Sequence, residues 1–438
     1  MHPTPSIVGR LTPTDAQALW MSEVIPSDQF LLYVFDGATT PAADLAARIP
    51  QRANRIDELS VRVVDVPGRL DRPWWSPATV TADAVRLHAV DRWAGCLRRL
   101  GELMSVPVDT RRLPWRVHVF VGVDDAPGSG GPSVVAVLQI AHALADGTLA
   151  SQLARRLFDD TPLPSPPHRR AGTAPPMLLA AGGVARVPLQ ATGLAVRGVR
   201  ALRAHRDRVR DEEAGRVPRG RDGVPLLPVN VRPDDRRDLR VVTTDTDTLR
   251  AVGGTVTVGA LTVIGRALAD HVDAALVHAE VLVAGVGDRR SRNHFRTVGV
   301  DLAVDEPDPR RRAARIAEDL AAMARRGHHP AARAEASAAA VVPAVLVAWG
   351  VRSFDAHAVP ERVVGNTVVS SVDRGADDLV FGGGRVVLTA GFPALSPVQS
   401  VTHGVHGIGG RVALSVCSSP TGLPDPDRYA GRLAAALG

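Results

Sequence analysis

The segment SVVAVLQI (Ser133–Ile140) constrains the fold of this chain more than any other feature of its sequence. A strand with one face in water alternates apolar and polar residues, whereas this segment is apolar on both faces. It is therefore predicted to be the central strand of a covered sheet. The preceding segment, Trp115–Val123, does alternate, and DDAPGSGGP between the two predicts a hairpin with a long loop.

Helices and strands are interspersed along the rest of the chain. A helix is predicted to begin at Thr148, which can cap it, because Leu149, Leu153 and Leu157 recur every four residues. Further helices are predicted at Val256–Val272 and after Asp308 and Asp425, and strands at residues 281–286, 297–304, 363–372, 385–389 and 411–417. This alternation predicts an α/β or α+β protein in two halves.

A change in composition divides the 438 residues. From Asp159 the sequence reads DDTPLPSPPHRRAGTAPP, which is typical of a linker. We predict a first domain at residues 1–160, a linker with a basic helix at 161–223, and a second domain at 224–438. The helix, residues 177–210, begins apolar and ends Arg-rich. It is interpreted as a solvated linker helix, with an interfacial helix on anionic lipid as the alternative.

Charge and length exclude several classes of protein. All 52 basic residues are Arg, yet 46 acidic residues are dispersed among them and aromatics make up only 4%, which argues against nucleic-acid binding. Cys96 and Cys417 are too few for a disulfide framework or a metal site, and they favour a reducing, cytoplasmic setting. The N-terminus lacks a signal-peptide pattern. The longest apolar run, residues 336–351, is interrupted by Pro343 and is too short to span a membrane.

The sequence AHALADG follows the central strand directly and carries the candidate chemistry. His142 is predicted to sit on rigid backbone and face an opening, where neutral imidazole can take a proton from a hydroxyl or an amine. Asp146 is predicted to fold back and brace the loop, and Gly147 permits the positive φ that a tight turn can require. The alternative from these residues alone is a hydrogen-bonded histidine at a strand end, followed by an ordinary Asp-Gly turn.

The remaining histidines and both cysteines are interpreted as structural. His403 and His406 lie in the Gly-rich VTHGVHGIGG, which predicts a turn between strands, and His328-His329-Pro330 predicts a polar loop. His271 and His278 are predicted on one helix. Cys96 and Cys417 are interpreted as small buried apolar residues.

Several segments resemble one known family. AHALADG resembles the HHxxxDG motif of the acyl-CoA-dependent acyltransferase superfamily, and nearly the whole chain resembles the bacterial wax ester synthase/diacylglycerol acyltransferase family. LTPTDAQALWMSE (residues 11–23) is similar to that family's opening LSPxDxxFLxxE, and LPW (113–115) to its PLW segment. NVRPDDRR, RTVGVDLAVDEPDPRRRAARI, NTVVSSVDRG, FGGGRV and GLPDPDRYAGRLAAAL follow in the family's order and spacing.

Three positions depart from the family pattern. Ala141 stands where the first His of the motif is expected, and in the wider superfamily the second His, here His142, is the base. The expected Asn-Asp pair is Thr257-Val258. The SNVPGP segment reads SSVDRG, from Ser370 through Ser371 to Gly375.

The resemblance implies two chloramphenicol acetyltransferase-like domains with mixed sheets, flanking helices and a tunnel between them. It implies direct acyl transfer from acyl-CoA, as a substrate rather than a cofactor, to an alcohol or a diacylglycerol, with His142 as base, Asp146 paired with an arginine, and no metal. The alternatives are an acyltransferase acting on a small-molecule hydroxyl or amine, and a non-catalytic relative. A cytoplasmic protein is expected, with a peripheral place at a membrane or lipid-droplet surface as a further expectation.

Overall fold

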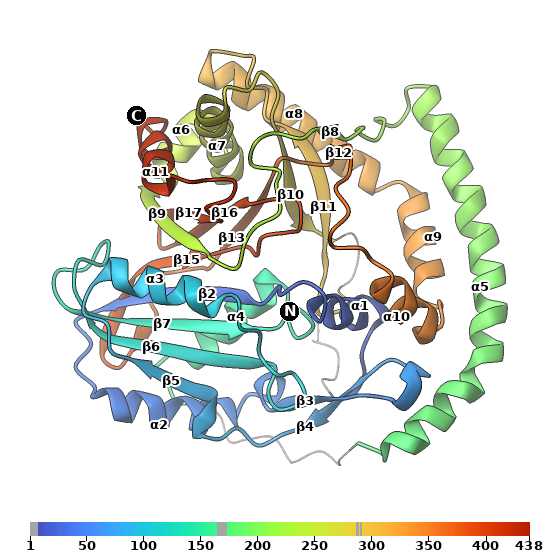
Figure 1. Cartoon of the computed structure of the whole chain (residues 1–438), viewed down its shortest axis with the longest axis horizontal. Coiled ribbons are helices and arrows are strands. Elements are labelled where there is room, and N and C mark those ends of the chain that lie inside the picture. The colour runs from blue at the N-terminus through green and yellow to red at the C-terminus, as the bar shows by residue number, and fades with distance from the viewer. Residues whose placement is uncertain (1–7, 164–172, 286–288, 290) are drawn as a thin grey trace.

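Two six-stranded mixed sheets form the frame of the molecule (Figure 1). The computed structural model describes residues 8–163, 173–285, 289 and 291–438. Residues 164–172 of the predicted linker lie outside this part of the chain. Helices and strands alternate in both halves, so the predicted α/β class with mixed sheets is confirmed.

The first sheet has the order β14-β15-β2-β7-β6-β5. Its strands are β2 (Gln29–Asp36), β5 (Val85–His88), β6 (Trp115–Val123), β7 (Ser133–Ile140), β14 (Val380–Phe381) and β15 (Gly384–Gly391). Every residue of β7 is buried, and the strand pairs antiparallel with both β2 and β6. The prediction of a central strand with a hairpin partner is therefore confirmed.

Two strands of this sheet come from late in the chain. β15 pairs antiparallel with β2, from Arg385 opposite Asp36 to Gly391 opposite Leu31. Residues 380–391 therefore belong in space to the first half, although the predicted boundary at residue 224 assigns them to the second. The boundaries stay a prediction about folding units, and this crossover ties the two halves together.

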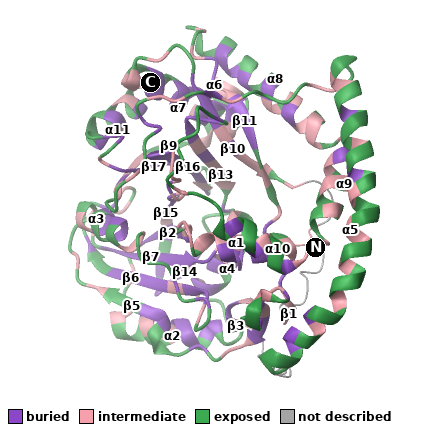
Figure 2. Ribbon diagram, turned by 45° about the vertical axis from the view of Figure 1, so that its right-hand side comes forward, coloured by how far each residue is buried: buried purple, intermediate pink, exposed green. Residues whose placement is uncertain are grey.

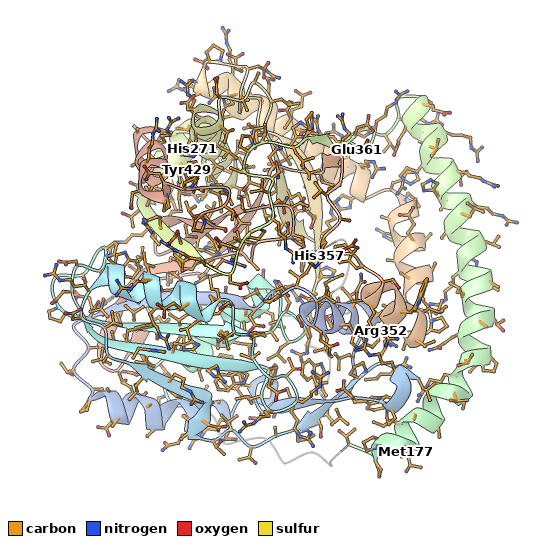
Figure 3. All side chains as sticks on the ribbon, viewed as in Figure 1. Met177, His271, Arg352, His357, Glu361 and Tyr429 are labelled. Atoms are coloured by element: carbon orange, nitrogen blue, oxygen red, sulfur yellow. The ribbon has the colours of Figure 1, made fainter. Side chains whose placement is uncertain are left out.

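The second sheet has the order β11-β10-β13-β16-β17-β9. Its strands are β9 (Asp238–Asp245), β10 (His278–Ala284), β11 (Phe295–Asp301), β13 (Thr367–Asp373), β16 (Val401–Ile408) and β17 (Arg411–Ser418). Two predictions were wrong here. His403 and His406 lie inside β16 rather than in a turn, and His278 begins β10, whereas His271 ends a helix beside the ring of Tyr429 (Figure 3).

Five short strands of the described residues lie outside these sheets: β1 (Gly9–Arg10), β3 (Val61–Val64) and β4 (Trp74–Pro77), which form a small sheet of their own, and the pair β8 (Val224–Pro225) and β12 (Arg362–Val363). The helices are α1 (Pro13–Ser22), α2 (Ala42–Ala53), α3 (Trp93–Leu103), α4 (Gly147–Leu157), α5 (Pro176–Glu213), α6 (Thr246–Gly253), α7 (Val256–Val272), α8 (Pro309–Gly327), α9 (Pro330–Ala339), α10 (Ala344–Arg352) and α11 (Pro426–Ala435). Short 3-10 turns occur at Asp57–Leu59, Pro67–Arg69 and Ala82–Ala84.

Each sheet buries one face in an apolar cluster of its own. One face of the first sheet packs against α1, α2 and α4, and the second sheet packs against α7, α8 and α11. A third cluster joins the sheets through α3, where Cys96 and Leu97 meet Leu239 and Cys417. Both cysteines are buried and unpaired, as predicted.

Helix α5 runs along the outside of both halves (Figure 2). Near its start, Arg186 pairs with Asp71 of the first half at 2.8 Å. Near its end, Arg208 pairs with Glu335 on α9 at 3.0 Å, and Glu212 pairs with Arg326 on α8. The predicted helix at 177–210 is confirmed, and its ion pairs make it a strap between the halves.

Within the described ranges, no single helix has the length and apolarity to cross a membrane. Two pairs of helices reach the length and apolar composition of a membrane span only when taken together, and each pair is bent where its helices meet. These are α6 with α7, bent by 78°, and α9 with α10, bent by 97°. The second pair contains the apolar run broken by Pro343. Most of α7 is buried in the second core.

Candidate active site

A cavity of about 580 Å³ lies between the two halves and contains the predicted site residues. His142, Asp146 and Gly147 line one side, and β13 contributes Ser370 and Ser371 opposite them. Apolar side chains make up much of the remaining wall: Met21, Ile25, Phe30, Leu31, Leu282, Val283, Phe295, Phe392, Pro393 and Leu395. An apolar wall with a few polar groups is typical of a small-molecule site.

His142 sits in the short turn that joins β7 to α4. Its ring lies 6.2 Å from the ring of Phe295, measured between centroids. Burial lowers the pKa of His142 below its usual value, while a hydrogen bond with Asn293 and the charge of Asp146 act in the opposite direction. A histidine with a lowered pKa is neutral at pH 7, so this ring can accept a proton there.

Asp146 lines the cavity, and its carboxylate also stabilises the turn. Its Oδ1 accepts a hydrogen bond from the Leu149 backbone N–H at 2.9 Å and so caps α4. Its Oδ2 accepts from the His294 backbone N–H at 3.0 Å and pairs with Arg289 at 2.9 Å. The cap of α4 is therefore Asp146, and the prediction of Thr148 was wrong because both residue types cap helices and spacing alone does not separate them.

Gly147 is the first residue of α4, and its φ is not positive. The expected turn therefore does not explain the glycine. A Cβ at this position would lie 3.2 Å from Cγ2 of Val372 on β13. Close approach of α4 to the second sheet accounts for it instead.

Two further residues hold the His142 turn, and the sequence reasoning assigned neither a role. Asn293 donates from Nδ2 to the backbone carbonyl of His142 at 2.6 Å. Asp15 on α1 is 1% exposed and accepts from the backbone N–H groups of Arg292 and Asn293. The signal available in the sequence was the LTPTD motif, whose aspartate is Asp15.

The two departures in the second half meet in space. The hydroxyls of Thr257, at the start of α7, and Ser371, on β13, lie 2.8 Å apart. Val258 packs into the second core instead. Ser371 and Val372 also line a second cavity of about 630 Å³, which Thr257 and Arg250 share. The hydroxyl pair therefore stands between the two cavities.

The hydroxyl pair yields a prediction of its own. Thr257→Val and Ser371→Ala are each expected to lower the free energy of unfolding by about 1 kcal/mol, because each removes one partly buried hydrogen bond. The double variant is expected to cost less than the sum of the two. Urea unfolding of the four proteins measures the coupling, and strictly additive losses would contradict the bond.

Metal-ligating side chains do not gather in this region. Across the described residues, no three His, Cys, Asp or Glu side chains lie close enough together to hold a metal ion.

Comparison with known sequences assigns the family. The family model described as "Wax ester synthase/diacylglycerol acyltransferase catalytic domain" matches residues 11–264, and the model of the WS/DGAT C-terminal domain matches residues 292–438. The chain belongs to the wax ester synthase/diacylglycerol acyltransferase family. It is accordingly an acyltransferase, and the resemblance of nearly the whole chain to this family is confirmed.

Solved structures show the same fold. The wax ester synthase/diacylglycerol acyltransferase from Marinobacter aquaeolei VT8 is 18% identical, with a TM-score of 0.64 and 98% of each chain covered. The starter condensation domain of rhizomide synthetase, solved with C8-CoA and Leu-SNAC, is 12% identical, with a TM-score of 0.56 and 99% of this chain and 93% of that chain covered. Trichothecene 15-O-acetyltransferase from Fusarium sporotrichioides is 11% identical, with a TM-score of 0.57 and coverage of 98% and 94%.

The departures from the family pattern can now be placed. Ala141 is 1% exposed and precedes His142 at the end of β7, so it packs into the protein rather than into the cavity. The hydroxyl pair Thr257–Ser371 takes the places where the family has asparagines.

Proposed function

We propose that this protein transfers an acyl group from acyl-CoA to the hydroxyl of an apolar acceptor, with His142 as general base. The observation that carries the proposal is the position of His142, which is poised to be neutral at pH 7 in a largely apolar cavity between the two halves. Asn293 donates to the turn, Asp15 holds Asn293, and Asp146 within the turn pairs with Arg289. Acyl-CoA is a substrate here, and no cofactor or metal takes part.

The reaction needs one base and two bound substrates. His142 takes the proton of the acceptor hydroxyl while its oxygen attacks the thioester carbonyl. The tetrahedral intermediate collapses, the C–S bond breaks, and the CoA thiolate leaves with the proton that His142 held. The acyl group passes directly between substrates, so no acyl-enzyme forms. Binding both substrates in one cavity supplies the proximity on which the rate depends.

Support for the donor comes from the fold. A condensation domain with this fold was solved with C8-CoA. Support for an apolar acceptor comes from the wall, where Phe30, Leu282 and Phe392 present apolar surface. The polar groups of Ser370 and Ser371 favour the alternative, a small-molecule hydroxyl or amine acceptor.

An acceptor panel separates these two functions. The purified protein is incubated with acyl-CoA and, in turn, a long-chain alkanol, a diacylglycerol, a small polar alcohol and a primary amine, and free CoA is measured. Transfer to the alkanol or the diacylglycerol at least tenfold faster than to the polar compounds supports the proposal. The reverse order would favour the small-molecule acceptor.

We further propose that α5 places the protein on a lipid surface. Its first half leaves large apolar side chains in water. Met177, near the start of the helix (Figure 3), is 71% exposed, and Leu189 is 76% exposed. Its second half carries exposed arginines for which the described residues provide no ion pair, including Arg200, Arg203 and Arg206. An apolar stretch beside a basic one is typical of helices that bind anionic lipid.

Vesicle binding tests the role of α5. Replacing Arg197, Arg200, Arg203 and Arg206 by glutamine is expected to weaken binding to anionic vesicles by at least tenfold, because each basic side chain near such a surface contributes about 1 kcal/mol. Binding of the parent is expected to fall with added salt. Turnover of a water-soluble acceptor should stay the same.

The matched control replaces four arginines elsewhere that are likewise exposed and form no ion pair among the described residues, Arg62, Arg98, Arg310 and Arg428. This control should lose much less binding than the α5 variant. Equal vesicle binding by the parent and the α5 variant would show that the segment is only a solvated linker.

A further inference from the structure

A buried arginine lies in the wall of the cavity, beyond the residues used so far. Arg374 follows β13 and is 3% exposed. Its Nη1 donates to the carbonyls of Leu32 and Ala390 and to the hydroxyl of Thr389, which join it to β2 and β15. Its Nε is buried without a hydrogen-bond partner. Nη1 is therefore anchored, while Nε has a free donor.

No acidic side chain among the described residues balances this charge. Arg374 is buried, and the only ionisable side chain of the described residues that acts on its charge is Tyr33. Asp373, beside it in the sequence, accepts instead from the backbone N–H of Gly375. Tyr33 lies under the guanidinium, 5.2 Å from the guanidinium carbon to the ring centroid, but burial raises the pKa of Tyr33 and keeps it neutral. A buried cation without an opposite charge beside it raises the free energy of the folded state, because it loses its hydration.

A second polar side chain converges on the same point. His406 of β16 lines the cavity, and its Nδ1 is buried without a hydrogen-bond partner. A Cβ on Gly391 would lie 2.6 Å from Nη2 of Arg374 and 2.8 Å from Cε1 of His406, so both groups press against this glycine. Burial and the charge of Arg374 lower the pKa of His406 well below its usual value, which leaves a neutral imidazole.

We propose that Arg374 and His406 form a carboxylate-binding site in the acyltransfer cavity, and that the acceptor is an apolar hydroxy acid. Nε and Nη2 of an arginine form the planar fork that matches the two oxygens of a carboxylate. One unbalanced positive charge suits one carboxylate better than a phosphate, which carries nearly two charges. The apolar wall takes the hydrocarbon body, and His142 meets the hydroxyl. This acceptor class rests on the proposed function, whereas the carboxylate site does not.

Calorimetry without acyl-CoA tests the site in the wild type. The ligands are a medium-chain ω-hydroxy fatty acid, its methyl ester, the matching alkanol and the plain fatty acid. Both acids are expected to bind at least about tenfold more tightly than the ester and the alkanol, because a hydrogen-bonded charge is involved. Equal affinity of the acid and its ester would overturn the proposal.

Variants then assign the preference to its residue. Arg374→Met is expected to remove the preference for acid over ester, and Arg374→Lys to keep part of it, because lysine retains the charge without the fork. Arg385→Met, an exposed arginine on β15, is the matched control and should keep it all. A preference that survives in folded Arg374→Met would overturn the assignment.

Acyl transfer completes the test. With acyl-CoA present, kcat/KM for the hydroxy acid is expected to exceed that for its ester by the same factor. A charge-selective protein that acylates no acceptor would retain the carboxylate site and refute the proposed function. A protein that acylates alkanols and binds acid and ester equally would support the proposed function and refute the carboxylate site.

Discussion

Replacing His142 by alanine is expected to lower kcat/KM for acyl transfer at least about a hundredfold, the usual loss when a general base is removed. The side chain lines the cavity from a turn whose backbone is held by Asn293 and Asp146, so the fold should survive its truncation. Steady-state CoA release measures the loss. Circular dichroism and the melting temperature check the fold.

The matched control is His357→Ala, since this histidine is exposed and does not line the cavity (Figure 3). It should retain full activity. Normal turnover by a folded His142→Ala protein would remove His142 from the mechanism.

As the general base, His142 also sets the pH dependence of the acyl-transfer rate. Burial lowers the pKa of His142 below its usual value of about 6.5, so the neutral form dominates at pH 7 and persists somewhat below 6.5. The rate should therefore be level near neutral pH and should fall only on the acid side, as the ring takes up its proton.

Replacing Asp146 by asparagine is expected to reduce both stability and activity. Asparagine still caps α4, but it removes the charge that faces Arg289 and that strengthens the bond from the His294 N–H. A loss of about 1–3 kcal/mol in the free energy of unfolding follows from weakening charge-assisted hydrogen bonds at a buried group. Urea unfolding measures it, and activity is assayed on the same samples.

The control for Asp146 is a second helix cap. Asp308 accepts from the Arg311 N–H at the start of α8 and is exposed, so Asp308→Asn should change stability little and activity not at all. An unchanged stability of Asp146→Asn together with lost activity would instead indicate that Asp146 acts directly in the reaction.

Periodicity predicts an element well where local burial decides its pattern. Ser133–Ile140 is apolar on both faces because both faces of β7 are covered, and its neighbour alternates because it is less deeply buried. The two glycines within Val401–Ile408 favour a turn, but this segment is a strand. Gly404 is required there by packing, since a Cβ would lie 2.2 Å from the carbonyl oxygen of Gly391. Sequence alone does not separate a glycine that packs from one that turns.

The site divides in the same way. His142, Asp146 and Gly147 are neighbours in sequence, so their motif could be seen. Asn293 holds the turn from 151 residues away, and Asp15 in turn holds Asn293, so only the folded chain brings these residues together. In the sequence, Thr257 and Ser371 are two separate departures from the family pattern. In the structure they form one contact.

In the proposed mechanism the acyl group passes from acyl-CoA to the acceptor without binding covalently to the protein. Following a labelled acyl group tests this directly. The wild-type protein is incubated with labelled acyl-CoA and a long-chain alkanol, and ester, free CoA and protein-bound label are measured together. Ester formed in an amount equal to the CoA released, with no label on the protein, is the result expected for direct attack of the hydroxyl on the thioester. Label held covalently on the protein, or CoA released without ester, would contradict it.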